Sequence, residues 1–227
     1  MEFVFWGMNT IMAEISGPCH DDRVPIPWQR TDRPSGLARR MALRVAGGYA
    51  LLATLATAIA LALRDGVPWV HPSPWMVMTP TSALATSALL GFTLAMGVVF
   101  TTRIAVGRFS WARRLHGELR PVARDLSIGH ILILAGLSSL GEELLFRGLL
   151  TPWLGVPLSA ILFGVVHQIR GPSRWVWVVW ATGVGAALGA IFALTGSLVG
   201  PLMAHTMINA INLSYLRDHD PSEGQAA

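Results

Sequence analysis

Five ionisable side chains lie inside otherwise apolar stretches of this sequence, and they are the residues best suited to chemistry. They are Glu142, Glu143, Arg147, His167 and His205. An ionisable group inside a lipid bilayer is energetically costly unless it is paired or lines a polar cavity. Two adjacent carboxylates contribute little to packing. We therefore expect these side chains to share a functional cavity.

Helical spacing separates the roles of the two glutamates. Glu143 and Arg147 are four residues apart, so they share a helix face and are predicted to form an ion pair. Glu142 is turned away from that face by about 100°. The spacing predicts a structural Glu143–Arg147 pair that leaves Glu142 pointing elsewhere. The alternative is that Glu142 is a second acceptor for Arg147.

His205 and Asn209 are also four residues apart and share a face. An imidazole and a carboxamide side by side can donate two hydrogen bonds to one oxygen, which is what an oxyanion site needs. The alternative is an ordinary hydrogen-bonded pair between membrane helices. His167 taken alone suits a helix interface, but the other polar groups nearby favour its presence in the same cavity.

The elements that must position these residues are membrane-spanning helices. The chain of 227 residues is 52% hydrophobic and 13% charged, whereas about a quarter of the residues in a soluble domain are charged. A transmembrane helix needs roughly 20 mainly apolar residues. Six spans are expected, at residues 41–63, 79–102, 125–151, 157–168, 175–194 and 198–216. The predicted fold is an all-α, polytopic membrane helix bundle.

The predicted domain organisation follows from these spans. A polar N-terminal tail covers residues 1–40, a helical membrane domain covers 41–217, and a short C-terminal tail covers 218–227. The fifth span is rich in Gly and Ala between positions 181 and 189, a pattern that lets helices approach closely. The lone Cys19 provides neither a disulfide framework nor a cysteine metal site.

The basic residues, all of them arginines, indicate the orientation of the chain. They gather in the tail, in segments 103–124 and 170–174, and at the end of the last span, which all fall on one side. The positive-inside rule therefore predicts that both termini are cytoplasmic. Segment 103–124 is compatible with an amphipathic helix on the membrane surface. The arginines form no basic stripe on a soluble fold, so we expect no nucleic-acid partner.

Three motifs in these spans resemble those of the CPBP family of intramembrane proteases, also called the Abi or CAAX-protease-like family. The first motif is Glu142-Glu143-x-x-x-Arg147, the second is Phe163-x-x-x-His167, and the third is His205-x-x-x-Asn209. All three occur in the family's order, each in an apolar helix. The resemblance covers residues 125–216, which would form the protease-like core.

This resemblance implies a glutamic-type intramembrane endopeptidase without a metal or other cofactor. In that scheme Glu142, assisted by His167, activates a water molecule that attacks the peptide carbonyl. His205 and Asn209 would stabilise the oxyanion, while Glu143 and Arg147 would support Glu142. The implied substrates are membrane-anchored or lipidated proteins cut near a terminus, and the implied location is a bacterial inner membrane.

Other functions remain open from the sequence. Two histidines and a glutamate are suitable ligands for catalytic zinc, although no His-Glu-x-x-His motif is present. A non-enzymatic immunity or scaffold protein is a second alternative. A transporter is a third, although the paired broken helices of many transporters are missing from the pattern.

The order of the spans predicts on which side of the membrane the site lies. Glu142 is about 17 residues, or roughly 25 Å, from the expected start of its span near Asp125. His205 is only a few residues from the start of the last span, which begins on the opposite side. Both positions predict a site near the outer leaflet that acts on exported membrane-anchored proteins.

Overall fold

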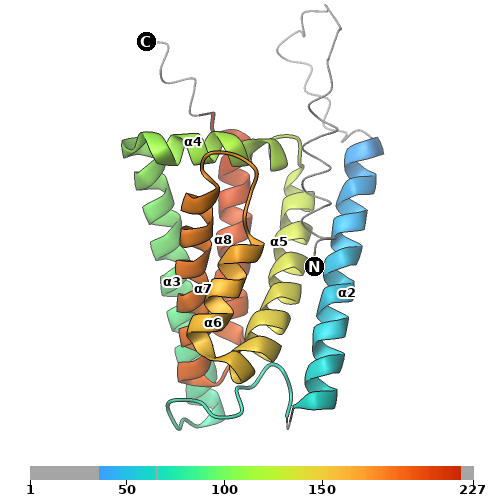
Figure 1. Cartoon of the computed structure of the whole chain (residues 1–227), viewed down its shortest axis with the longest axis vertical. Coiled ribbons are helices and arrows are strands. Elements are labelled where there is room, and N and C mark those ends of the chain that lie inside the picture. The colour runs from blue at the N-terminus through green and yellow to red at the C-terminus, as the bar shows by residue number, and fades with distance from the viewer. Residues whose placement is uncertain (1–35, 65, 221–227) are drawn as a thin grey trace, which may run out of the picture.

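The computed structural model describes residues 36–64 and 66–220, in which every regular element is helical (Figure 1). The predicted all-α class is therefore confirmed. Cys19 and most of the predicted N-terminal tail, as well as residues 221–227, lie outside the described residues. The elements, in chain order, are α2 (Gly36–Leu63), α3 (Pro80–Arg108), α4 (Ser110–Leu119), η1 (Arg120–Val122), α5 (Ile128–Glu143), η2 (Leu144–Leu150), α6 (Thr151–Val166), α7 (Arg174–Thr195) and α8 (Val199–Asp218).

The helices match a polytopic membrane protein. Within the described residues, 4 segments are long and apolar enough to cross a membrane: Arg44–Leu63, Pro80–Arg108, Ile128–Val166 and Arg174–Thr195. The third segment contains α5, η2 and α6, and α6 turns back along the bundle (Figure 1). It therefore provides two of the expected spans. The last expected span is α8, which is less apolar because it carries the His205 motif.

Local sequence signals explain where several helices begin and end. Pro80 is the first residue of α3, and the Thr79 side chain caps that helix by accepting a hydrogen bond from the Ser82 amide at 3.3 Å. The α7 helix ends at Gly196, whose φ of +76° favours glycine. A similar glycine, Gly155 with φ of +74°, bends α6 near its start.

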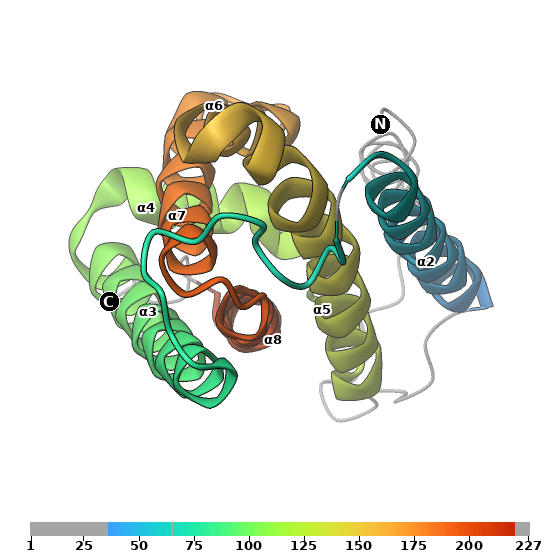
Figure 2. The same cartoon turned by 90° about the horizontal axis from the view of Figure 1, so that it is seen from below.

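The α2–α3 loop crosses one end of the bundle and is bound to the turn between α7 and α8 (Figure 2). The His71 amide donates to the Gly196 carbonyl at 2.9 Å, and the Leu198 amide donates to the Trp69 carbonyl at 3.1 Å. The Arg64 guanidinium donates to the carbonyl of Gly148 in η2. This loop therefore holds η2 and the α7–α8 turn in place.

Small residues bring α3 and α8 into close contact. A methyl group at Gly91 would overlap the Gly200 carbonyl, so the two backbones meet without intervening side chains. The Ser87 hydroxyl donates to the Ser197 carbonyl and accepts from the Gly200 amide, both at 2.9 Å. The predicted close approach at the fifth span is also present, because a Cβ at Gly185 would lie 2.9 Å from the Phe163 ring of α6.

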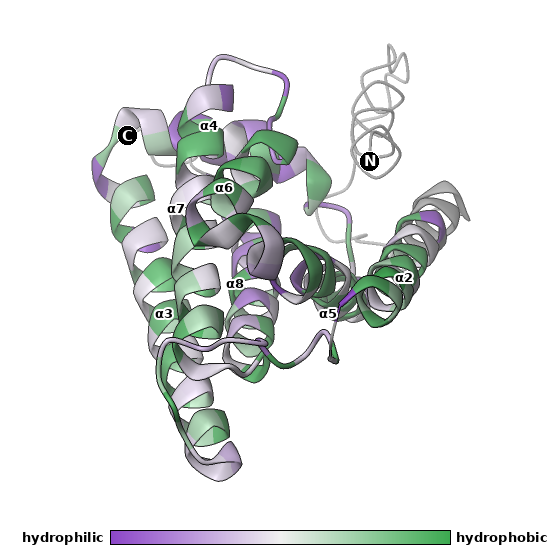
Figure 3. Cartoon of the chain, turned by 60° about the horizontal axis from the view of Figure 1, so that its bottom comes forward, coloured by the Kyte–Doolittle hydropathy of each residue, from purple (hydrophilic) through white to green (hydrophobic). Residues whose placement is uncertain are grey.

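At the other end of the bundle, α4 lies across the helix ends (Figure 1). Its Ala112, Leu115 and His116 are buried, whereas Trp111 is exposed. Much of the surface of α2 and α3 is hydrophobic, while hydrophilic residues gather near α4 (Figure 3). The predicted amphipathic helix in segment 103–124 is shorter than expected, because α3 continues to Arg108 and the separate helix is α4.

Candidate active site

The first motif lies on an unusual stretch of helix. Glu142 and Glu143 end α5, and Arg147 lies in η2, which is a π-helix. The wider turn is stabilised by two buried hydroxyls, because Thr151 Oγ1 and Ser159 Oγ both donate to the Phe146 carbonyl, at 2.8 and 3.1 Å. Short π-helical insertions occur often at functional sites.

The predicted ion pair between Glu143 and Arg147 is present and fully buried. Arg147 Nη1 lies 2.9 Å from Glu143 Oε1, and the two side chains are 1% and 0% exposed. Arg147 Nη2 donates to the Gly185 carbonyl at 2.9 Å, and its guanidinium lies 4.5 Å from the centre of the Phe163 ring. The pair therefore also ties η2 to α6 and α7.

Glu143 has a second partner that the spacing did not predict. His205 Nδ1 lies 2.7 Å from the same oxygen, Glu143 Oε1. Since Glu143 is paired with Arg147, we treat it as a carboxylate, and it therefore accepts a hydrogen bond from His205 Nδ1–H. This bond fixes the orientation of the His205 ring.

Glu142 faces both histidines. Its Oε2 lies 3.4 Å from His167 Nε2 and 3.7 Å from His205 Nε2. The Glu142 side chain is 11% exposed and that of His167 is 17% exposed, so the site is buried but not sealed. Glu142 Oε2 accepts no hydrogen bond from the described residues. The prediction that Glu142 points away from Arg147 toward other groups agrees with this arrangement.

The His167 ring is fixed by its own helix. Its Nδ1 lies 2.7 Å from the Phe163 carbonyl oxygen, and the two rings are 4.2 Å apart. A carbonyl oxygen only accepts hydrogen bonds, so His167 carries a proton on Nδ1 and directs Nε2 at Glu142. The second motif therefore places a phenyl ring and an oriented imidazole together on one face of α6.

The charges of the cluster give a proton count. Glu142 and Glu143 as carboxylates and Arg147 as guanidinium leave one net negative charge in a buried site. Such a charge is costly in a bilayer. One additional proton on the two histidines would neutralise the cluster, and both face Glu142 through Nε2.

Asn209 lies beside α5, one turn away from Glu142. Its Nδ2 donates to Ser138 Oγ at 3.2 Å, and Ser138 is four residues before Glu142 on the same helix. The structure thus brings Glu142, His167 and His205 together directly, and connects Asn209 to that helix face through Ser138. Farther along α8, Asn212 accepts a hydrogen bond from Arg103 at 3.0 Å.

One residue of the site was not predicted from the sequence. Tyr49 of α2 is buried, and its phenol interacts with the Glu142 carboxylate. The only sequence signal is a tyrosine within an apolar span, which says nothing about its partner. Among the described residues, no group of three or more His, Cys, Asp or Glu side chains is arranged to hold a metal ion.

Comparisons with known proteins cover the second half of the chain. Residues 124–211 match the family model for type II CAAX prenyl endopeptidases, Rce1-like. Over 91 residues the chain is 34% identical to the uncharacterized protein YpbD of Bacillus subtilis strain 168. The aligned stretch is 40% of this chain and 48% of that protein. The chain thus matches about half the length of that relative. No solved structure matches. The family match contains α5, α6, α7 and the motif residues of α8, but not α2.

Proposed function

We propose that this membrane protein is a glutamic-type intramembrane endopeptidase, because residues 124–211 match the Rce1-like model of CAAX prenyl endopeptidases and contain the three motifs that resemble this family. The observation that supports the proposal best is the convergence of the Glu142 carboxylate with two oriented imidazoles, at 3.4 and 3.7 Å. Its substrates are membrane-anchored or lipidated proteins.

In the proposed reaction, water is bound between Glu142 and His167 Nε2. Both groups are acceptors when His167 is neutral, so each takes a hydrogen bond from the water. Glu142 removes one proton as the water oxygen attacks the peptide carbonyl. That proton then passes to the departing amine, so the hydroxyl ends on the acyl product and the proton on the amine product.

His205 and Asn209 stabilise the oxyanion in this proposal. His205 Nδ1–H is engaged by Glu143 at 2.7 Å, so Nε2 can donate only when both ring nitrogens are protonated. Asn209 Nδ2 would exchange its bond to Ser138 for one to the oxyanion. Oxyanion donors typically contribute about 10²–10³ in rate.

We also propose that the site opens away from the α4 side of the membrane. The α5 helix begins next to η1 and the arginine-rich α4, and Glu142 lies at its far end, about 20 Å along the helix. The positive-inside rule places α4 in the cytoplasm. In a Cys19→Ser background, a cysteine at position 142 that reacts with impermeant reagents only from the cytoplasmic side would refute this orientation.

The function is tested with purified protein reconstituted in liposomes and a panel of membrane-anchored and lipidated peptides. Glu142→Gln keeps the size of the side chain and removes the base, so we expect cleavage to be lost. Asp125→Asn, at an exposed carboxylate before α5, is the matched control and should cleave like the wild type.

Two results would contradict the proposal. Equal cleavage by the wild type and Glu142→Gln would refute the role of Glu142 as base. Cleavage that a chelator abolishes and zinc restores would favour the zinc-dependent alternative over a glutamic mechanism. Each reaction is therefore run with and without chelator, and products are identified by mass spectrometry.

A further inference from the structure

Tyr49 lies against the backbone of the first motif. A Cβ on Gly141 would be 2.9 Å from the Tyr49 carbonyl oxygen and 3.4 Å from Tyr49 Cδ1. The absence of a side chain at Gly141 therefore lets the tyrosine ring fit directly beside the turn that carries Glu142. The phenol then interacts with the Glu142 carboxylate.

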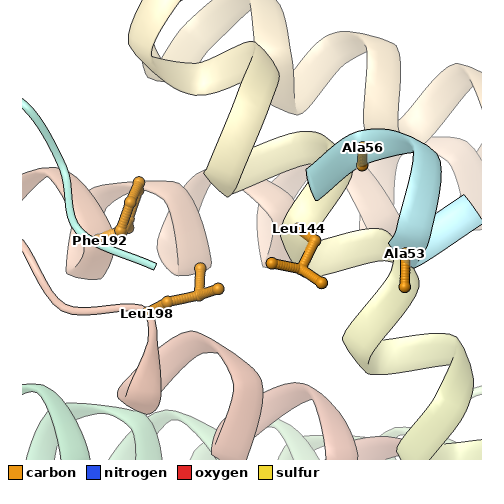
Figure 4. Close-up of a cluster of buried hydrophobic side chains, with 5 residues drawn as sticks. All are labelled: Ala53, Ala56, Leu144, Phe192 and Leu198. Carbon is orange, nitrogen blue, oxygen red and sulfur yellow. The ribbon is translucent and has the colours of Figure 1, made fainter. Parts of the chain in front are cut away.

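The register of α2 against the site is fixed by packing. Ala53 and Ala56 pack in one buried cluster with Leu144, the first residue of η2 (Figure 4). Tyr49, Ala53, Ala56 and Ala60 are all buried and recur at helical spacing, so they form the face that α2 turns toward α5 and η2. Rotation of α2 would lose these contacts, and Tyr49 is thus held at a defined position.

The chemistry of this contact suits a positioning role. A tyrosine hydroxyl donates one hydrogen bond, and a bond to a carboxylate is stronger than one between neutral groups. Glu142 Oε2 faces His167 and His205 at 3.4 and 3.7 Å, which is longer than the 2.7–2.9 Å typical of a charge-assisted hydrogen bond. A hydrogen bond from a third group on another helix would hold the carboxylate more firmly in this orientation.

We propose that Tyr49 is a positioning residue of the peptidase, whose hydroxyl donates a hydrogen bond to the Glu142 carboxylate and holds Oε2 toward the two histidines. The inference rests on the proposed function. It also places one component of the site on α2, outside the segment that matches the endopeptidase family. The catalytic carboxylate is then oriented by a helix that the family segment does not contain.

The kinetic test is Tyr49→Phe, which keeps the ring and removes the hydroxyl. Tyr215→Phe is the matched control, because the other tyrosine of the chain lies under the Arg103 guanidinium, 3.6 Å from it. We expect kcat of Tyr49→Phe to fall about 10- to 100-fold, as for loss of one hydrogen bond to a charged group, with KM unchanged. A kcat equal to that of the wild type, or a change confined to KM, would overturn the proposal.

An infrared measurement tests the contact without any substrate. The Glu142 carboxylate stretching band is the one that Glu142→Gln removes. We expect this band to shift in Tyr49→Phe and to stay in place in Tyr215→Phe. An unshifted band in Tyr49→Phe would overturn the contact itself. If the band shifts in Tyr49→Phe but the wild-type protein cleaves none of the peptides, the contact is present and the result counts against the peptidase. Failure of the contact and failure of the proposed function are thus distinguishable.

Discussion

Replacement of Arg147 by methionine should strongly destabilise the bundle. Methionine keeps the length of the side chain but removes its hydrogen bonds to Glu143 and to the Gly185 carbonyl, both 2.9 Å long. Glu143 has no exposed surface in its side chain, so it would be left as a buried carboxylate without a countercharge on its own helix, with His205 Nδ1–H as its remaining partner. Breaking such a pair from one side costs about 3–5 kcal/mol, or roughly a thousandfold in the folding equilibrium constant.

The measurement is equilibrium unfolding by titration of mixed micelles with sodium dodecyl sulfate, followed by the fluorescence of the nine tryptophans. The double variant Glu143→Gln/Arg147→Met carries no buried charge at these positions and should recover at least half of the lost stability. Arg124→Met is the control, because this exposed arginine forms a surface pair with Asp125 at 3.3 Å and its replacement should cost less than about 1 kcal/mol.

The reasoning would be refuted by either of two results. One is a loss of less than about 1 kcal/mol in Arg147→Met. The other is a double variant that is less stable than the single variant, since removal of the stranded carboxylate should help.

Two further predictions concern packing and pH. Gly91→Ala should destabilise the bundle by about 1–3 kcal/mol in the same titration, because its methyl would overlap the Gly200 carbonyl. Gly97→Ala is the control, because a Cβ at Gly97 would have no described neighbour within 4 Å outside its own stretch of helix. This control should be neutral or stabilising by up to about 1 kcal/mol. Burial, together with His219 and two arginines nearby, lowers the pKa of His116 in α4 below its usual 6.5. As the pH falls, His116 therefore takes up a proton in the unfolded chain at a higher pH than in the folded chain. The free energy of unfolding should fall as the pH drops below about 6.5. His116→Gln should reduce the pH dependence of stability, measured as the melting temperature from pH 5 to 8. A pH dependence equal to that of the wild type would contradict this role of His116.

The parts of the site that sequence predicts are those set by spacing within one helix. Glu143 and Arg147 meet because they are four residues apart, and the pair forms although the intervening turn is a π-helix. His205 and Asn209 likewise share a face of α8. The apolar runs locate the spans, because a bilayer requires long uninterrupted helices.

Contacts between helices could not be predicted in the same way. The bond from His205 to Glu143 joins residues 62 positions apart, and it depends on how α8 packs on α5. Tyr49 is a comparable case, since helical periodicity places it on a buried face of α2 without saying which helix covers that face. The break expected between the spans at 125–151 and 157–168 is present at Gly155, which bends α6 near its start, but the π-helix before it has no recognised sequence signal.

The contact between α3 and α8 has a consequence for biosynthesis. Its hydrogen bonds join Ser87 to Ser197 and to Gly200, which are 110 and 113 positions away. During translation α3 enters the membrane long before α8 has been made, so its Ser87 and Gly91 surface first faces lipid or the insertion machinery. Because α8 also supplies His205, the candidate site can assemble only after α8 has been made, and a peptidase of the proposed kind would therefore be inert toward neighbouring membrane proteins while its chain is still being synthesised.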